Sequence, residues 1–182
     1  MKALVPILTV VAALCGMSVS AKESPASGVS SSGVIAWSVD PNSGTIFLNY
    51  ASGAPGEWKL CGISSTENLR VDFSPDDRYI FVTDGTVSRG VHVTLYKRGS
   101  SLKFSKVDFS FSFAVQRLAL AAEAGVKIDK SVLTYTDLRC LGWTRNGTAR
   151  LKLSGSGRLN GKTVEISGFE CEYDPVARSF SA

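Results

Sequence analysis

The chain has 182 residues, of which 44% are hydrophobic and 20% are charged, a balance typical of a globular protein. This composition excludes a disordered acidic tail, a collagen and a multi-pass membrane protein, and the length allows one domain. The 20 Lys and Arg residues against 16 Asp and Glu residues give a net charge of +4. The basic residues are scattered, with no run longer than Lys97-Arg98, so nucleic-acid binding is not indicated.

The N-terminal segment has the layout of a secretory signal peptide. Lys2 supplies a positive start, residues 3–19 are apolar and uncharged, and Val19-Ser20-Ala21 offers small residues at a cleavage site. The apolar stretch is short for a membrane span. We therefore expect residues 1–21 to be removed, and the mature protein to be exported and periplasmic.

Three cysteines remain after such a cleavage, and export would place them in an oxidising compartment. They are Cys61, Cys140 and Cys171, so at most one internal disulfide leaves one thiol, and three pairings are possible. We favour a disulfide between Cys140 and Cys171, because both lie in strand-like segments near the C-terminus. Cys61 is then expected to be a buried thiol in a strand.

Past the signal segment, the sequence predicts a flexible linker followed by one domain rich in strands. Residues 22–33 are small and polar and contain Pro, Gly and Ser, which is typical of a linker. From residue 34 to residue 182 the pattern is short apolar alternation bounded by turn residues. Residues 79–83 and 91–96 are rich in β-branched and aromatic side chains, which favour strands.

Two Asn-Gly pairs, at 146–147 and 160–161, predict tight hairpins. One segment departs from the strand pattern. Residues 113–124 are rich in Ala, Leu, Gln, Arg and Glu, and predict a helix that Ser112 caps and Gly125 ends. Its apolar face would carry Val115, Leu118 and Ala122, and we expect this helix to cover a sheet.

Four pairs of an aromatic and a hydroxyl residue recur at almost equal spacing. The aromatic residues are Trp37, Phe73, Phe109 and Trp143, at spacings of 36, 36 and 34 residues. A turn and a strand pattern follow three of the four pairs, and the third pair runs into the expected helix. The spacing is compatible with an internal repeat and with coincidence, and the sequence alone leaves both open.

Residues 69–85 and 91–98 carry a family resemblance. The segment LRVDFSPDDRYIFVTDG followed by VHVTLYKR resembles a blade of a WD-repeat or TolB-like β-propeller. It departs from that pattern at Asp77, where Gly is usual, and it lacks the Trp-Asp ending. The resemblance implies a mainly β fold of antiparallel hairpins in a small or partial propeller-like arrangement, with one short helix near 112–124. A β-sandwich with propeller-like hairpins is the alternative.

The sequence contains few candidates for catalysis. The only histidine, His92, sits between two valines in an expected strand, and the cysteines and this histidine lack zinc spacing. We expect no catalytic residue, no metal and no cofactor. A periplasmic hydrolase is a less favoured alternative, and it would use carboxylates of the turns and of one strand face: Asp76, Asp77, Asp84, Glu170 and Glu172.

A small exported protein without a catalytic set is typically a binding module, and exposed loops on a rigid sheet are its natural contact element. The most conspicuous loop is basic and rich in hydroxyls: Arg98, Gly99, Ser100 and Ser101. The whole profile is similar to periplasmic immunity proteins of type VI secretion systems. That resemblance implies that the loop blocks the active site of a secreted cell-wall amidase through Ser100 and Ser101.

Two alternatives to this contact stay open. Ser110 and Ser112, at the entry of the expected helix, are a second candidate loop. A module for protein–protein interaction in the cell envelope is an alternative to the immunity function. The sequence gives neither the partner nor the oligomeric state.

Overall fold

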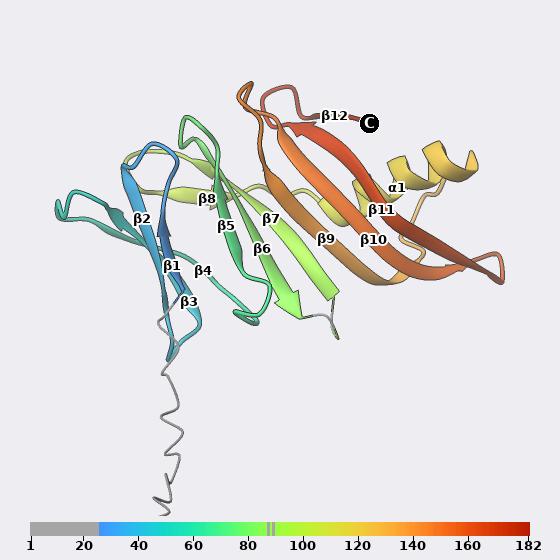
Figure 1. Ribbon diagram of the computed structural model, residues 1–182, viewed down its shortest axis with the longest axis horizontal. Coiled ribbons are helices and arrows are strands. Elements are labelled where there is room, and N and C mark those ends of the chain that lie inside the picture. The colour runs from blue at the N-terminus through green and yellow to red at the C-terminus, as the bar shows by residue number, and fades with distance from the viewer. Residues whose placement is uncertain (1–25, 87, 89) are drawn as a thin grey trace, which may run out of the picture.

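The computed structural model describes residues 26–86, 88 and 90–182 (Figure 1). The predicted signal peptide, residues 1–21, lies outside the described residues. The helix, α1, spans Phe111–Ala124. The strands are β1 (Ser27–Val29), β2 (Ile35–Asp40), β3 (Thr45–Tyr50), β4 (Glu57–Gly62), β5 (Arg70–Phe73), β6 (Tyr79–Thr86), β7 (Gly90–Arg98), β8 (Phe104–Lys106), β9 (Leu133–Trp143), β10 (Ala149–Leu159), β11 (Lys162–Asp174) and β12 (Ser179–Ser181).

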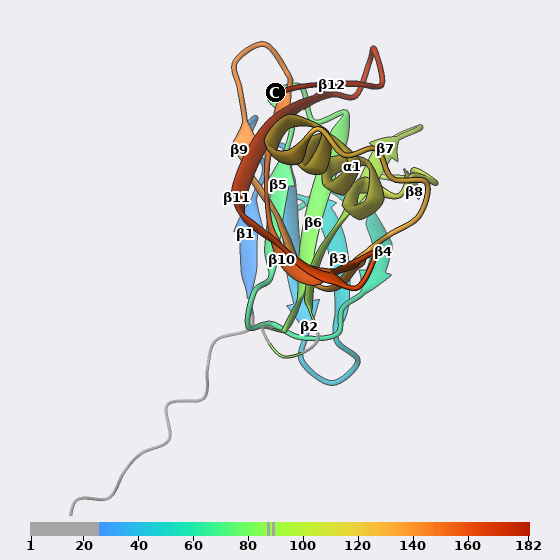
Figure 2. The same ribbon diagram turned by 90° about the vertical axis from the view of Figure 1, so that its right-hand side faces the viewer.

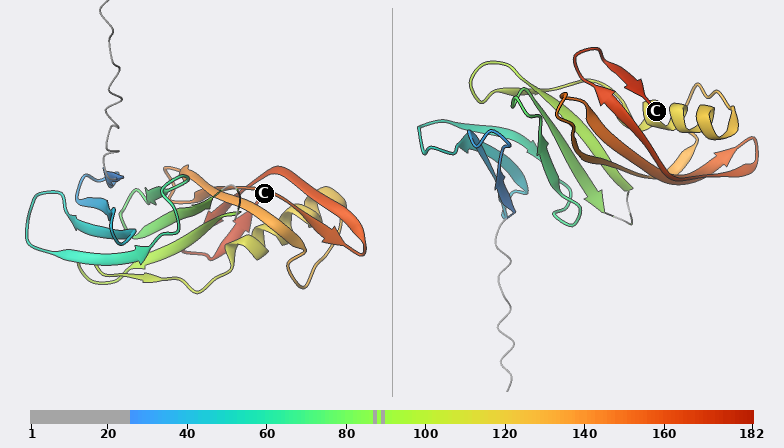
Figure 3. Two further views of the ribbon diagram at one scale, coloured as in Figure 1. Left: turned by 90° about the horizontal axis from the view of Figure 1, so that it is seen from below. Right: turned by 45° about the horizontal axis from the view of Figure 1, so that its top comes forward.

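The strands form three antiparallel meanders of four strands each. The first meander, β1–β4, is a separate sheet. The second, β5–β8, and the third, β9–β12, share one sheet of eight strands, in which β7 pairs with β9. The first meander lies at one end of the molecule and the third lies at the other, together with α1 (Figure 3). The fold is mainly β with one short helix, and this confirms the predicted fold class.

The second and third meanders meet through a parallel strand pair. Val91 of β7 stands opposite Asp137 of β9, and the chain between these strands passes through β8 and α1. Parallel neighbours require such a crossover, because a tight turn cannot return the chain to the same end. The crossover places α1 on one face of the eight-stranded sheet, inside the curve of β10 and β11 (Figure 2).

Two hydrophobic cores lie on opposite faces of β6, because successive side chains of a strand point to opposite sides. The helix-side core contains Tyr79 and Phe81 of β6. The sheet-side core contains Ile80 and Val82 of the same strand. All four side chains are buried, so β6 runs through the interior of the molecule.

The helix-side core is built from α1 and the long strands β9, β10 and β11. Phe111, Val115 and Ala119 lie four residues apart on the helix and are buried against this sheet. The core contains many rings: the centroids of Phe81 and Phe111 are 5.2 Å apart, and those of Phe81 and Trp143 are 5.5 Å apart.

The sheet-side core is built from the first and the second meander. Its members from β2 and β3 are mostly aliphatic. Those that are fully or almost fully buried are Ile35, Val39, Ile46 and Leu48. Sheet packs on sheet here, and no helix contributes to the described part of this core.

The predicted helix is present, but its start and its buried face differ from the expectation. It begins at Phe111 with Ser110 at the N-cap, and Gly125 ends it with a φ of 63°, as predicted. Leu118 is half-buried and Ala122 is exposed. Val115 is buried as predicted, but the buried face continues through Phe111, Ala119 and Leu120 instead of Ala122, because the helix starts earlier and Phe111 packs against the sheet.

Both Asn-Gly hairpins are confirmed. Asn160 and Gly161 connect β10 to β11 with φ values of 51° and 78°, the left-handed pair of a type I′ turn. Gly147, with a φ of 80°, lies in the turn between β9 and β10.

The aromatic-hydroxyl pairs mark hairpins and not equivalent positions of a repeat. Trp37, Phe73 and Trp143 each lie in a strand that enters a hairpin: β2–β3, β5–β6 and β9–β10. Trp37 is in the second strand of its meander, however, whereas Phe73 and Trp143 are in the first strand of theirs. Phe109 lies in no strand and precedes α1.

The linker predicted for residues 22–33 is wrong in its second half. Residues Ser27–Val29 form β1, which pairs with β2, and Ser30 is buried. Their small side chains suited a linker, but the edge of β2 satisfies their backbone groups. No helix among the described residues is long and apolar enough to cross a membrane.

Candidate functional site

The predicted contact loop is the hairpin that connects β7 to β8, as the sequence indicated. The amide of Gly99 donates to the carbonyl of Lys103 at 2.8 Å, and the amide of Lys103 donates to the carbonyl of Ser100 at 2.9 Å. Nε of Arg98 donates to the carbonyl of Ser101 at 2.5 Å. Ser101 has a φ of 54°, so the loop turns through a left-handed residue. These bonds fix the backbone of the loop.

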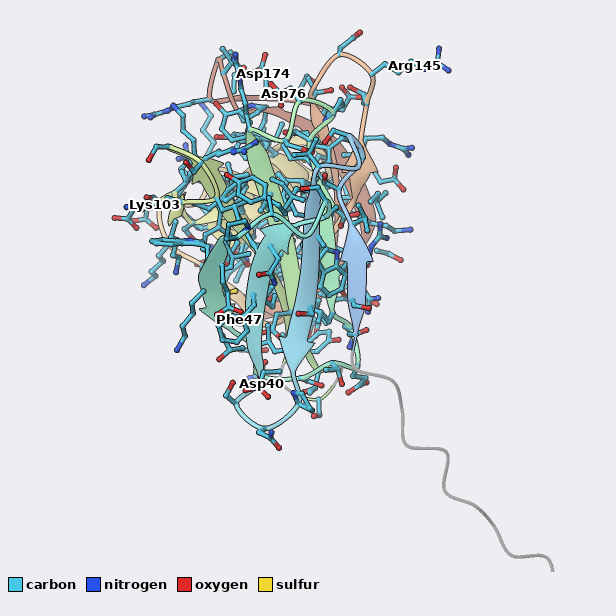
Figure 4. The ribbon with its side chains drawn as sticks, turned by 90° about the vertical axis from the view of Figure 1, so that its left-hand side faces the viewer. Asp40, Phe47, Asp76, Lys103, Arg145 and Asp174 are labelled. Carbon is cyan, nitrogen blue, oxygen red and sulfur yellow. The ribbon has the colours of Figure 1, made fainter. Side chains whose placement is uncertain are left out.

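The next residues anchor this loop in the sheet-side core. Leu102 is 4% exposed and belongs to that core. The Lys103 ammonium lies 6.0 Å from the ring centroid of Trp58 in β4, so the first meander also supports the loop. Figure 4 shows Lys103 at the side of the molecule, away from the Asp40 turn. The hydroxyls of Ser100 and Ser101 are exposed and have no hydrogen-bond partner among the described residues.

The second candidate loop holds Ser110 and Ser112 at the start of α1. Ser110 is the N-cap residue and is exposed, but its side chain makes no capping hydrogen bond. Ser112 lies in the first turn and is half-buried. Both residues flank Phe111, whose burial fixes the helix, so this segment offers one exposed hydroxyl where the β7–β8 loop offers two.

Two of the candidate carboxylates, Asp76 and Asp77, stabilise the turn between β5 and β6. Asp76 accepts from the hydroxyl of Ser74 at 2.7 Å and from the amide of Arg78 at 3.1 Å. Burial raises the pKa of the Asp76 carboxyl, but these hydrogen bonds outweigh it and leave the pKa below its ordinary value. The Asp76 carboxylate therefore has a structural role in the β5–β6 turn.

Asp77 connects the first meander to the second. Its side chain is 3% exposed, and its Oδ2 accepts from the hydroxyls of Ser30, at 3.0 Å, and Ser32. Both serines belong to the connection between β1 and β2. The residue has a φ of 54°, a left-handed conformation that Gly adopts most easily and that Asp tolerates better than most other residues.

The remaining candidate carboxylates also have structural partners. Asp84 accepts from the amide of Ser64 at 2.9 Å, and this hydrogen bond attaches the connection between β4 and β5 to β6. Glu170 pairs with Arg150 at 3.0 Å, and Glu172 accepts from Thr148 at 2.8 Å. His92, in β7, is exposed and stands opposite Asp84. Among residues 26–86, 88 and 90–182, no group of three or more His, Cys, Asp or Glu residues is placed to hold a metal ion.

The predicted disulfide between Cys140 and Cys171 is wrong. Both thiols are free and buried, and Leu151 of β10 stands between them, paired with Cys140 on one side and with Cys171 on the other. Two strand spacings separate the cysteine Cα atoms by roughly 9–10 Å. A disulfide requires less than about 7 Å.

Burial makes these thiols unreactive. Loss of solvation raises the pKa of Cys140 to about 12 and that of Cys171 to about 11, so neither forms a thiolate near neutral pH. Cys61 lies in β4, as expected for a strand thiol, and is half-buried. Burial raises its pKa as well.

The sequence reasoning missed a cleft on the helix side of the molecule. Three adjoining cavities of about 520, 560 and 180 Å³ lie between α1, the segment before it and the turn from β11 to β12. Arg178 lines all three, Phe109 lines the two larger ones, and Tyr173 lines the last two. We call these cavities together the helix-side cleft.

Basic residues from distant parts of the chain line this cleft. They are Lys97, Lys106, Arg117, Lys127 and Arg178. Lys106 of β8 stands opposite Tyr96 of β7, whose side chain belongs to the sheet-side core. Because paired residues of neighbouring strands point to the same face, the side chain of Lys106 points away from the cleft. No short sequence pattern could have revealed the other four, because they come from β7, α1, the connection after α1 and the β11–β12 turn.

No family model and no curated protein matches the sequence of this chain.

Proposed function

We propose that the protein is an exported inhibitor of the immunity type, which binds a secreted cell-wall amidase and blocks its active site with the β7–β8 loop. The observation that carries this proposal is the pair of exposed hydroxyls, Ser100 and Ser101, on a loop whose backbone is fixed. Arg98 and Leu102 hold the loop from its two ends. A loop held in one conformation loses little entropy on binding, and this favours tight association.

The chemistry of the loop fits a polar cleft in a partner. Hydroxyl groups both donate and accept hydrogen bonds, so they can pair with catalytic side chains of an amidase without being cleaved. The candidate carboxylates support a binding protein rather than the alternative hydrolase, because each of them already accepts hydrogen bonds from its own turn or from a neighbouring segment.

The test first asks whether a gene next to the one for this protein encodes an exported amidase, and then uses that amidase in purified form. We expect the purified protein to bind it and to inhibit its hydrolysis of peptidoglycan at equimolar concentration. The variant removes both hydroxyls as Ser100→Ala with Ser101→Gly, because glycine tolerates the φ of 54° that alanine would strain. Losing hydrogen bonds at a desolvated contact costs about 1–3 kcal/mol, roughly 5- to 150-fold in Kd.

Ser156→Ala is the matched control, because Ser156 is an exposed serine of β10 on the face opposite α1. Ser156→Ala should bind the amidase like the unchanged protein. The free energy of unfolding of both variants should lie within about 0.5 kcal/mol of that of the unchanged protein. Unchanged inhibition by the loop variant would assign the contact to Ser110 and Ser112 instead. A neighbour that binds without amidase activity would favour an envelope interaction module, and no binding at micromolar concentration would end the proposal.

A further inference from the structure

The helix-side cleft has a strong imbalance of charge. Lys97, Arg117, Lys127 and Arg178 line it with their side chains exposed, and Asp108 is its only acidic lining residue among those described. None of these four cations forms an ion pair with a described residue. Some basic residues outside the cleft do form ion pairs, as Arg139 of β9 does with Asp137 at 2.6 Å. The cations of the cleft are therefore available to an anionic ligand.

The centre of the cleft is aromatic. Phe109 is 43% exposed, which is unusual for so large an apolar side chain in this protein. Its ring stacks with those of Tyr173 and Phe180, at centroid distances of 6.2 and 6.0 Å. The stack holds Phe109 in place, and one side of it stays open between the two larger cavities.

Two tyrosine hydroxyls add hydrogen-bonding groups at one end. Tyr79 and Tyr173 line the smallest cavity beside Lys97 and Arg178. Both tyrosines are at least nine-tenths buried, and neither hydroxyl has a hydrogen-bond partner among the described residues. Burial raises the pKa of Tyr173 and the charge of Arg178 opposes this rise, so the two groups are close enough to interact. Both hydroxyls are therefore free to form a hydrogen bond with a ligand that enters this cavity.

The arrangement of the cations favours a long ligand over a compact one. Arg117 and Lys127 line only the cavity of about 520 Å³, and Lys97 lines only the other two. Arg178 lines all three. A single phosphate or carboxylate can contact one end alone. An extended chain with spaced carboxylates can contact both ends and place an apolar side chain on Phe109.

We propose that the helix-side cleft binds an extended acidic segment of a partner protein, with its carboxylates on Lys97, Arg117 and Arg178 and an apolar side chain against Phe109. This site is separate from the β7–β8 loop and does not require the loop to block an amidase. It gives the protein a second contact on another face.

The test measures fluorescence anisotropy with a fluorescein-labelled peptide, Glu-Leu-Glu-Phe-Glu-Leu-Glu, at low ionic strength. We expect it to bind at least about 10-fold more tightly than the same peptide with glutamine in place of glutamate, and to weaken as salt screens the charges. Equal binding of the two peptides would overturn the proposal.

A triple variant, Lys97→Gln with Arg117→Gln and Arg178→Asn, should weaken binding about 10-fold, since each exposed pair contributes modestly. Asparagine is used at 178 because that residue has a φ of 53°. The matched control, Lys59→Gln with Arg158→Gln and Lys162→Gln, removes three exposed charges outside the cleft. A similar loss in the control would show that net charge, and not the cleft, binds the peptide, and would refute the site.

Phe109→Ala tests the aromatic part of the site. This variant should bind the peptide several-fold more weakly, and its affinity should depend on salt concentration as strongly as that of the unchanged protein. Melting curves of each variant, compared with the unchanged chain, separate a local effect from unfolding. Polyphosphate and single-stranded DNA of equal charge serve as competitors. If either binds more tightly than the peptide and loses its affinity in the triple variant, the ligand is a phosphate polymer and the acidic peptide is rejected.

Discussion

The two hydrophobic cores differ in how they are held together, although they share β6. The helix-side core is rich in rings from β6, α1, β9 and β11, which contact one another edge to face or at a tilt. The sheet-side core is mostly aliphatic. Hydrogen bonds from Ser30 and Ser32 to the carboxylate of Asp77 join its two sheets at their turns. The stability of the first core therefore depends on ring packing, and that of the second depends in part on one buried carboxylate.

The largest effect should come from removing a ring of the helix-side core. Phe81 is fully buried and contacts Phe111, Trp143 and Tyr173. Phe81→Ala should lower the free energy of unfolding by about 3–5 kcal/mol, because it deletes the ring and leaves a cavity. Urea denaturation followed by circular dichroism measures this change.

Ile80→Val is the control on the opposite face of the same strand, and should cost about 0.5–1.5 kcal/mol. A cost below about 1 kcal/mol for Phe81→Ala would mean that the rings rearrange to fill the space, and the contrast between the cores would fail.

An intermediate effect should come from the polar connection of the sheet-side core. Asp77→Ala removes the acceptor of Ser30 and Ser32, and it replaces a residue that tolerates a φ of 54° with one that tolerates it less well. We expect a loss of about 2–4 kcal/mol from the hydrogen bonds and the backbone strain together. Asp77→Asn tolerates the same φ and retains one acceptor, so thermal unfolding should show a smaller loss. If both variants match the unchanged chain, the two sheets do not depend on this carboxylate.

The smallest effect should be a pH dependence at Asp72, near the boundary of the two cores. Burial raises the pKa of this carboxyl above its ordinary 3.8, although Arg70 opposes the rise from 2.9 Å. Below about pH 3.8 the group is protonated in both states. As pH rises toward the folded pKa, the unfolded state ionises first, so stability falls.

Asp72→Asn should therefore remove this decrease, and the variant should be slightly more stable than the unchanged chain at pH 7 but not at pH 3. Denaturation midpoints across this range measure it. A variant that is less stable at pH 7 would show that the ion pair with Arg70 outweighs the cost of burial.

The sequence predicted those parts of the fold that local chemistry determines. The Asn-Gly turns, the strands at 79–83 and 91–96 and the stop of the helix at Gly125 depend on backbone preferences of a few neighbouring residues, and all are found. The mainly β class follows from the same patterns. The pairing of β7 with β9 was not predicted, because residues from distant parts of the chain make it.

The wrong disulfide and the missed cleft have the same cause. Cys140 and Cys171 both looked like strand residues of one region, but their sequence positions do not reveal that β10 separates them. Lys97, Arg117 and Arg178 looked like scattered surface charges until the crossover brought their elements together. The position of the β7–β8 hairpin could be predicted from the sequence, because Arg98, Gly99, Ser100 and Ser101 follow one another along the chain.

The crossover between β7 and β9 also has a consequence for the order of folding. Each meander consists of hairpins whose strands are close in sequence, so each can form early and at low entropic cost. The parallel pair of Val91 and Asp137 must bring together residues separated by β8 and α1. We expect the docking of β9 and α1 to be the slow step. Until it occurs, Phe81 and the inner face of α1 are open to water, so a chain halted at this stage is the one most exposed to aggregation and proteolysis.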